Sequence, residues 1–170
     1  MRWMIVGVAA LALAGCAKHP VHTGGTPPPP VAIESDSITY ETGPCFGACP
    51  VYSITVRPDG SGVFTGKRFT AVTGERAFKL TPGQYSAFAA RLQKYRPASG
   101  EKRIAPGEPG CANVATDLPS VDITWRRAIG DSQHLYYYYG CNMGGDHAMA
   151  NALGGAIEDL PLEPLIGERP

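Results

Sequence analysis

A short loop rich in cysteine and proline constrains the fold of this chain more than any other stretch. Residues 44–50 read Pro-Cys-Phe-Gly-Ala-Cys-Pro, and they run directly into the segment Val51–Val56. In that segment Tyr52, Ile54 and Val56 fall on one side of an extended chain and the polar residues fall on the other, which predicts a half-buried β-strand. We therefore expect a compact cysteine-bearing turn at the beginning of a core strand.

The N-terminus has the pattern of a bacterial lipoprotein signal. Arg2 precedes an apolar run from Met4 to Ala14 that contains no charge or proline and is too short to span a bilayer. The run leads into Leu13-Ala14-Gly15-Cys16, which resembles the lipobox at which the signal is removed and the cysteine is acylated. We expect a signal peptide over residues 1–15 and a lipid, including palmitate, on Cys16. An ordinary signal peptide with a chance cysteine is the alternative.

The residues after Cys16 indicate how the chain is held and sorted. Residue 17 is alanine and not aspartate, and the lipoprotein resemblance then implies the outer membrane, facing the periplasm. Residues 16–35 are expected to form a tether, because Pro27-Pro28-Pro29-Pro30 favours an extended polyproline II arm. Attachment to the membrane is therefore expected to depend on covalent lipid.

The charge balance gives no support for a nucleic acid partner and does not indicate another kind of partner. The chain has 15 basic and 15 acidic side chains, so net charge gives no reason to expect a nucleic acid partner. The sequence also lacks a phosphate-binding glycine loop and a nucleophile elbow. We expect no cofactor and no catalytic residues. The expected partners are the membrane and an unidentified envelope protein or ligand.

Four cysteines remain once Cys16 carries lipid, namely Cys45, Cys49, Cys111 and Cys141. An even number in an oxidising compartment predicts two disulfides, for which three connectivities exist. We prefer the pairs Cys45–Cys49 and Cys111–Cys141, the second of which would hold an irregular segment in place. A cross-pairing such as Cys45–Cys141 stays open.

The pair Cys45 and Cys49 also permits a chemical interpretation. A thiol-disulfide oxidoreductase that uses these two cysteines is the alternative to a structural bond. Three residues separate them and a strand follows, whereas thioredoxin-type sites have two intervening residues at a helix N-terminus. A metal site would need further ligands at suitable spacing, and none is expected.

The rest of the chain predicts an α+β domain. We expect strands over residues 37–41, 52–56, 62–66, 76–80, 121–126 and 134–139, and irregular structure over residues 97–119. A first helix is expected to start at Thr81-Pro82-Gly83-Gln84, which has the pattern of a capping box, and to stop by Pro97. A second is expected between Asp146 and Pro161.

These elements predict a single domain over residues 36–162, followed by a C-terminal tail at 163–170. Its architecture would be an antiparallel sheet of about five strands with two helices on one face. Both halves consist of a hairpin followed by a helix, and their opening strands are similar. We therefore hypothesise an internal duplication, which requires both helices to lie on the same face.

The run Tyr136-Tyr137-Tyr138-Tyr139 is the candidate binding surface, because aromatic rings stack on sugars and bases. On a strand, Tyr136 and Tyr138 would share one face, while Tyr137 and Tyr139 would share the other. We expect one pair to belong to the core and the other to lie on a half-exposed sheet face. His134, on the same strand, is expected to be exposed or hydrogen-bonded.

Several of these segments together resemble a known family. They are Cys45 to Tyr52, the helix after it, Thr116-Asp117-Leu118-Pro119 and the final strand to Gly140-Cys141. The chain is similar in these places to bacterial envelope proteins with a DUF6438 domain, over about residues 36–160. This resemblance implies one exported domain and, because the family has no known function, no catalytic residues or substrate.

Overall fold

The computed structural model describes residues 36–141 and 145–167. All the described residues belong to one compact unit. The expected signal peptide, the lipid attachment at Cys16 and the tether lie outside the described residues. Within the described part, no helix has the length and apolar character needed to cross a membrane.

A seven-stranded sheet organises the domain. Its strands are β1 (Ser37–Thr42), β2 (Val51–Val56), β3 (Ser61–Arg68), β4 (Gly74–Lys79), β5 (Glu101–Ile104), β6 (Ser120–Arg126) and β7 (Gln133–Tyr138). They lie in the order β4-β3-β2-β1-β6-β7-β5. All neighbours are antiparallel except β5 and β7, which pair in parallel.

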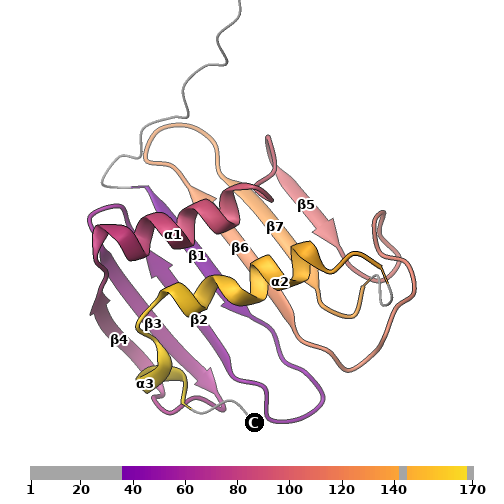
Figure 1. Cartoon of the computed structure of the whole chain (residues 1–170), viewed down its shortest axis with the longest axis horizontal. Helices are drawn as coiled ribbons and strands as arrows, with labels where there is room; N and C mark the ends of the chain where they lie inside the picture. The colour runs from indigo at the N-terminus through magenta and orange to yellow at the C-terminus, as the bar shows by residue number, and fades with distance from the viewer. Residues whose placement is uncertain (1–35, 142–144, 168–170) are drawn as a thin grey trace, which may run out of the picture. The chain divides into compact units, whose positions relative to one another are not determined.

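The helices lie on one side of this sheet (Figure 1). They are α1 (Pro82–Gln93), α2 (Ala148–Gly155), the 3-10 turn η1 (Ala156–Asp159) and α3 (Glu163–Ile166). Figure 1 shows α1 and α2 in front of the strands and crossing them. The prediction of an α+β fold with an antiparallel sheet and two main helices is confirmed.

The six expected strand segments correspond to β1–β4, β6 and β7, so the stated total of about five was too low, and β5 was missed altogether. Residues 101–104 read Glu-Lys-Arg-Ile and fall in the segment expected to be irregular. Three of the four are exposed, so the sequence shows no alternation of apolar and polar residues. Pairing with β7, in which Glu101 lies beside His134, forms this strand, and such pairing is not visible in a local pattern.

Residues assigned to a C-terminal tail extend the packed structure. Helix α3 buries Ile166. The carbonyls of Leu165 and Ile166 accept hydrogen bonds from the amides of Val72 (3.1 Å) and Ala71 (3.0 Å). This segment therefore closes over the loop that joins β3 to β4.

Helix α1 starts as the sequence predicted. The hydroxyl of Thr81 accepts from the amide of Gln84 (3.2 Å), and the side chain of Gln84 accepts from the amide of Thr81 (2.9 Å). This reciprocal capping box satisfies two amides that the helix leaves unpaired. Phe88 and Leu92 follow at helical spacing and are fully buried against the sheet.

Helix α2 packs against Tyr139. Asp146 accepts a hydrogen bond from the amide of Ala148 (2.8 Å), which is the first residue of the helix. Further along, a Cβ added at Gly154 would lie 3.4 Å from the hydroxyl oxygen of Tyr139, which is an ordinary van der Waals contact. Gly154 therefore marks the point where the helix backbone lies close to this tyrosine.

The two halves of the domain share a helix face but differ in strand content. Helices α1 and α2 lie on the same side (Figure 1), as the duplication hypothesis required. Four strands precede α1, however, whereas β6 and β7 alone form the hairpin before α2. Internal duplication stays a hypothesis.

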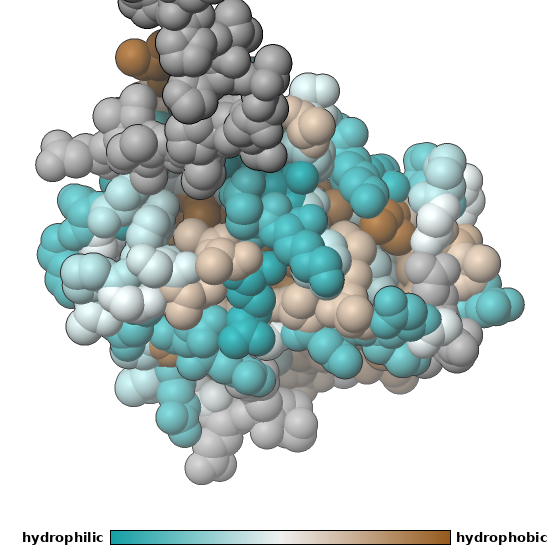
Figure 2. Space-filling model, turned by 45° about the horizontal axis from the view of Figure 1, so that its top comes forward, coloured by the Kyte–Doolittle hydropathy of each residue, from teal (hydrophilic) through white to brown (hydrophobic). Residues whose placement is uncertain are grey.

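The sheet buries one face and leaves the other polar. Side chains toward the helices form the core, and Ile54, Phe64, Ile123 and Leu135 are fully buried there. The opposite face, here called the open face, alternates with them and carries Thr39, Ser53, Thr55, Thr65, Asp122 and Thr124. Figure 2 views the helical side from its upper edge. Hydrophilic and weakly apolar residues are intermingled there, and strongly hydrophobic residues form only small separate spots among the coloured atoms.

Replacement of Phe88 tests this one-sided core. Phe88→Ala should reduce the free energy of unfolding by about 3–5 kcal/mol, because it leaves a cavity under α1. Phe46→Ala is the matched control: Phe46 is 87% exposed, so its loss should change stability by about 0.5 kcal/mol or less. Denaturant unfolding of both variants gives the comparison, and equal losses would contradict the assigned core.

Candidate functional site

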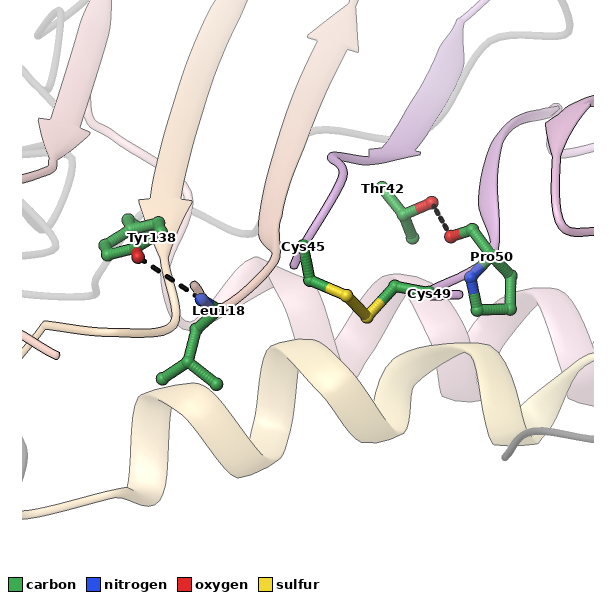
Figure 3. The surroundings of a disulfide bond; sticks show 6 residues. All are labelled: Thr42, Cys45, Cys49, Pro50, Leu118 and Tyr138. Carbon is green, nitrogen blue, oxygen red and sulfur yellow. Dashed lines mark hydrogen bonds between the residues drawn. A yellow bond between two sulfur atoms is a disulfide. The ribbon is translucent and has the colours of Figure 1, made fainter. Parts of the chain in front are cut away.

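Two disulfides lie at the same end of the sheet. Cys45 is bonded to Cys49 with a Cα–Cα distance of 5.8 Å, and Cys111 is bonded to Cys141 with a Cα–Cα distance of 4.8 Å. Both distances fall in the usual range for disulfides. This is the connectivity that the sequence analysis preferred, and Figure 3 shows the first bond with its surroundings.

The loop that contains Cys45 and Cys49 is held from both sides. On one side, Thr42 at the end of β1 donates its hydroxyl to the carbonyl of Pro50 (2.8 Å) and accepts from the amide of Tyr52 (3.0 Å). On the other, the amide of Phe46 donates to the carbonyl of Asp117 (3.1 Å). The bond and these contacts together fix the geometry of the connection between β1 and β2.

The second disulfide fastens an irregular segment to the end of β7. Cys141 is 1% exposed, and the amide of Ala115 donates to the carbonyl of Gly140 (2.8 Å). Gly140 is required there because a Cβ would collide with the carbonyl oxygen of Ala115. The hydroxyl of Tyr138 accepts from the amide of Leu118 (3.3 Å), as Figure 3 shows, and donates to the carbonyl of Ala115 (3.1 Å).

A cavity of about 280 Å³ opens beside the first disulfide. The ends of β1, β2, β6 and β7 form its floor, and α2, η1 and α3 contribute its other walls. Its lining includes Thr42, Cys49, Pro50, Ser120, Tyr139 and Ile157. A mainly apolar hollow with a few hydroxyl groups is the usual form of a small-molecule site, and this volume lies just below the usual range.

Tyr139 provides an unusual polar group in that cavity. Its hydroxyl oxygen is buried and makes no hydrogen bond with any of the described residues. Burial raises the pKa of Tyr139 to about 12, and the neighbouring Tyr40 hydroxyl has a smaller, lowering effect on this pKa. Tyr40 donates its own proton to the carbonyl of Leu153 (3.1 Å). Tyr139 is therefore a neutral hydroxyl at neutral pH.

The tyrosine run divides between the two faces of the sheet. Tyr137 is 3% exposed and contacts Tyr139 edge to face, with ring centroids 5.4 Å apart. Tyr136 and Tyr138 lie on the open face, half-buried. The guanidinium of Arg103 lies 4.0 Å from the ring centroid of Tyr136. Two of the four tyrosines are thus packed on the helical side, and the two on the open face already have partners.

His134 forms a cluster that sequence reasoning missed. Its Nε2 lies 2.7 Å from Asp122 Oδ1, and its Nδ1 lies 3.3 Å from Glu101 Oε1. The three residues come from β7, β6 and β5, so the cluster depends on the strand that was not predicted. Among the described residues, no group of three or more histidine, cysteine or acidic side chains has the geometry of a metal site.

The comparison with known families decides the classification of the chain. A family model described as "Domain of unknown function (DUF6438)" matches residues 36–160, which is most of the chain. The chain belongs to the DUF6438 family. Both disulfides, the cavity and the His134 cluster lie mainly or wholly in the matched part of this DUF6438 domain. Among curated proteins, the search found no match to the chain.

The hydroxyls of Tyr138 and Tyr139 offer a matched test of the site. Tyr138→Phe should lower the free energy of unfolding by about 1–2 kcal/mol, because it leaves the Leu118 amide without its partner. Tyr139→Phe should preserve or raise stability, since the hydroxyl it removes is buried without a hydrogen bond. Chemical denaturation at neutral pH measures both, and a greater loss for Tyr139→Phe would contradict the geometry described here.

Proposed function

We propose that this chain is a lipid-anchored protein of the bacterial cell envelope whose DUF6438 domain is a disulfide-stabilised binding or structural module. The proposed location is the outer membrane, facing the periplasm. The N-terminal lipid on Cys16 attaches the protein to the membrane. The remaining partner is an envelope protein or a ligand that the domain holds at a distance from the bilayer.

The pairing of all four domain cysteines is the observation that carries this proposal. Cys45–Cys49 and Cys111–Cys141 account for every cysteine after Cys16. Disulfides of this kind persist in oxidising compartments and are rare where thiols are kept reduced. Together with an apolar leader that ends in a lipobox-like sequence, the pairing favours an exported, anchored protein.

The surroundings of Cys45 and Cys49 favour a structural bond over a redox site. The bond joins the end of β1 to the start of β2, in a loop with no helix in it. A helix N-terminus or a neighbouring cation lowers the pKa of a reactive thiol, and here strands flank both cysteines. The contacts of Thr42 and Phe46 further hold the loop in one arrangement.

The cavity beside this bond supports the binding part of the proposal. Its apolar walls, with the hydroxyl residues Thr42 and Ser120 among them, suit a small and mainly apolar molecule. A volume of about 280 Å³ corresponds to the space of roughly nine waters in the liquid. The ligand that fits inside is therefore small, or enters with one end only.

Substitution of the proposed lipid site tests the anchor. In cells fed an alkyne fatty acid, the wild-type chain should acquire the label and Cys16→Ala should lose it and accumulate as the longer precursor. Ala17→Ser, which keeps the cysteine, is the matched control and should be labelled normally. In-gel fluorescence and an intact-mass measurement report both results. Equal labelling of Cys16→Ala would overturn the proposed anchor.

A further inference from the structure

The open face of the sheet carries a second hollow, at the opposite end of the strands from the disulfides. It has a volume of about 340 Å³ and is lined by Ser37, Thr39, Thr55, Arg57, Thr124 and Arg126. These residues come from the three central strands β1, β2 and β6, or follow directly on them. Among the described residues that line it there are two guanidinium groups, four hydroxyls and no carboxylate.

The strand register brings these side chains together in two rows. Thr39 of β1 pairs with Thr55 of β2 on one side and with Thr124 of β6 on the other. In the next row, Ser37 pairs with Arg126, and Arg57 follows β2 on the other side of β1. Neighbouring strands are about 4.8 Å apart. The two arginines therefore stand about two strand spacings apart on either side of Ser37, over a floor of hydroxyl groups.

Neither guanidinium is neutralised by a carboxylate of the described residues. Arg57 and Arg126 form no ion pair with any of the described residues. Two acidic groups elsewhere on this face have basic partners: Glu41 pairs with Lys67 (2.5 Å), and Asp122 lies 2.7 Å from His134.

Asp59, whose carboxylate feels the charge of Arg57, has other partners. Asp59 Oδ1 accepts from both the amide (2.8 Å) and the hydroxyl (2.6 Å) of Ser61. These bonds lower the pKa of Asp59, and Lys79 and Arg57 lower it further through their charge. Lys79 pairs with Ser61 across β3 and β4, so it adds a third positive charge beside this end of the sheet. Positive charge therefore exceeds negative charge around the hollow.

Threonines on an exposed strand are common, because β-branched residues favour strands. The arrangement here differs in that two unpaired arginines flank the hydroxyls. Arginine presents several N–H donors in a plane and binds phosphate with two parallel hydrogen bonds. A phosphate monoester has three terminal oxygens and so accepts more bonds than a carboxylate does, which suits a site with this many donors.

We propose that Arg57 and Arg126, with the hydroxyls of Ser37, Thr39 and Thr124, form a binding site for a phosphate monoester on the open face. The arginines hold the terminal oxygens from two sides, and the hydroxyls donate from the floor. With phosphate bound there, Thr55 donates to the Thr39 hydroxyl (3.0 Å), which leaves the Thr39 proton for the phosphate. The phosphate belongs to a soluble metabolite or to a lipid headgroup. This site goes beyond the anchored binding or structural module proposed above and is independent of the cavity beside Cys49.

Titration of the mature full-length chain, purified in a nonionic detergent, tests the site. Inorganic phosphate at low ionic strength should bind with a dissociation constant of about 1 mM or tighter and shift the Nε–Hε NMR signals of Arg57 and Arg126. Arg57→Gln and Arg126→Gln should each weaken binding by about tenfold or more. Arg103→Gln, on the same face but stacked on Tyr136, is the matched control and should leave binding unchanged.

Three results would overturn the proposal: the absence of phosphate binding, equal binding of acetate, or equal weakening by Arg103→Gln. Each would mean that the arginines attract anions without forming a specific site. Unaltered thermal unfolding of the variants excludes misfolding as the cause of any loss. Glycerol 3-phosphate in solution and phosphatidic acid in the micelle are then compared as ligands, to identify whether the phosphate belongs to a metabolite or to a lipid. The one that binds more tightly, and whose binding is lost in both arginine variants, represents the natural kind of ligand.

Discussion

The two disulfides at one end of the sheet hold segments that have little apolar surface of their own. In the segment between β5 and β6, Ala105 is buried, but most residues from 106 to 117 are exposed. Such a segment gains too little from burial to offset the loss of chain entropy on ordering. The bond from Cys111 to Cys141 closes a loop of 30 residues, which by chain entropy stabilises the fold by about 3.7 kcal/mol.

The two disulfides position the strand ends that border the cavity beside Cys49. The segment held by Cys111 supplies the Ala115 and Asp117 carbonyls that fix Tyr138 and the Phe46 loop. The cavity then forms between these fixed strand ends and the backbone of α2, which lies close to Tyr139 at Gly154. At the opposite end of the strands no such clamp exists among the described residues, and there the open face presents Arg57 and Arg126. The two candidate sites thus lie at opposite ends and on opposite faces of one rigid sheet.

Local patterns predicted the parts of the fold that local physics determines. The capping box at Thr81 and the alternation of β2 each follow from a few consecutive residues, and both are present in the structure. Strand β5 was not predictable in this way, because its residues are mostly charged and its pairing partner lies about thirty positions away in β7.

The same limit applies to the candidate sites. Net charge near zero concealed the local excess of positive charge, since Arg57 and Arg126 meet only through the register of three strands. The cluster of His134 with Glu101 required β5 in the same way. The alternation of side chains along a strand was enough to divide the tyrosine run between the two faces of the sheet. Which of these faces is covered depends on where the helices pack.

The disulfide connectivity of the protein isolated from cell envelopes tests this account most directly. Free thiols would be blocked during lysis, the chain digested without reduction, and the peptides identified by mass spectrometry. The account predicts two linked species, Cys45 with Cys49 and Cys111 with Cys141, and no blocked cysteine in the domain. Blocked thiols at these four positions, or a link such as Cys45 to Cys141, would contradict it.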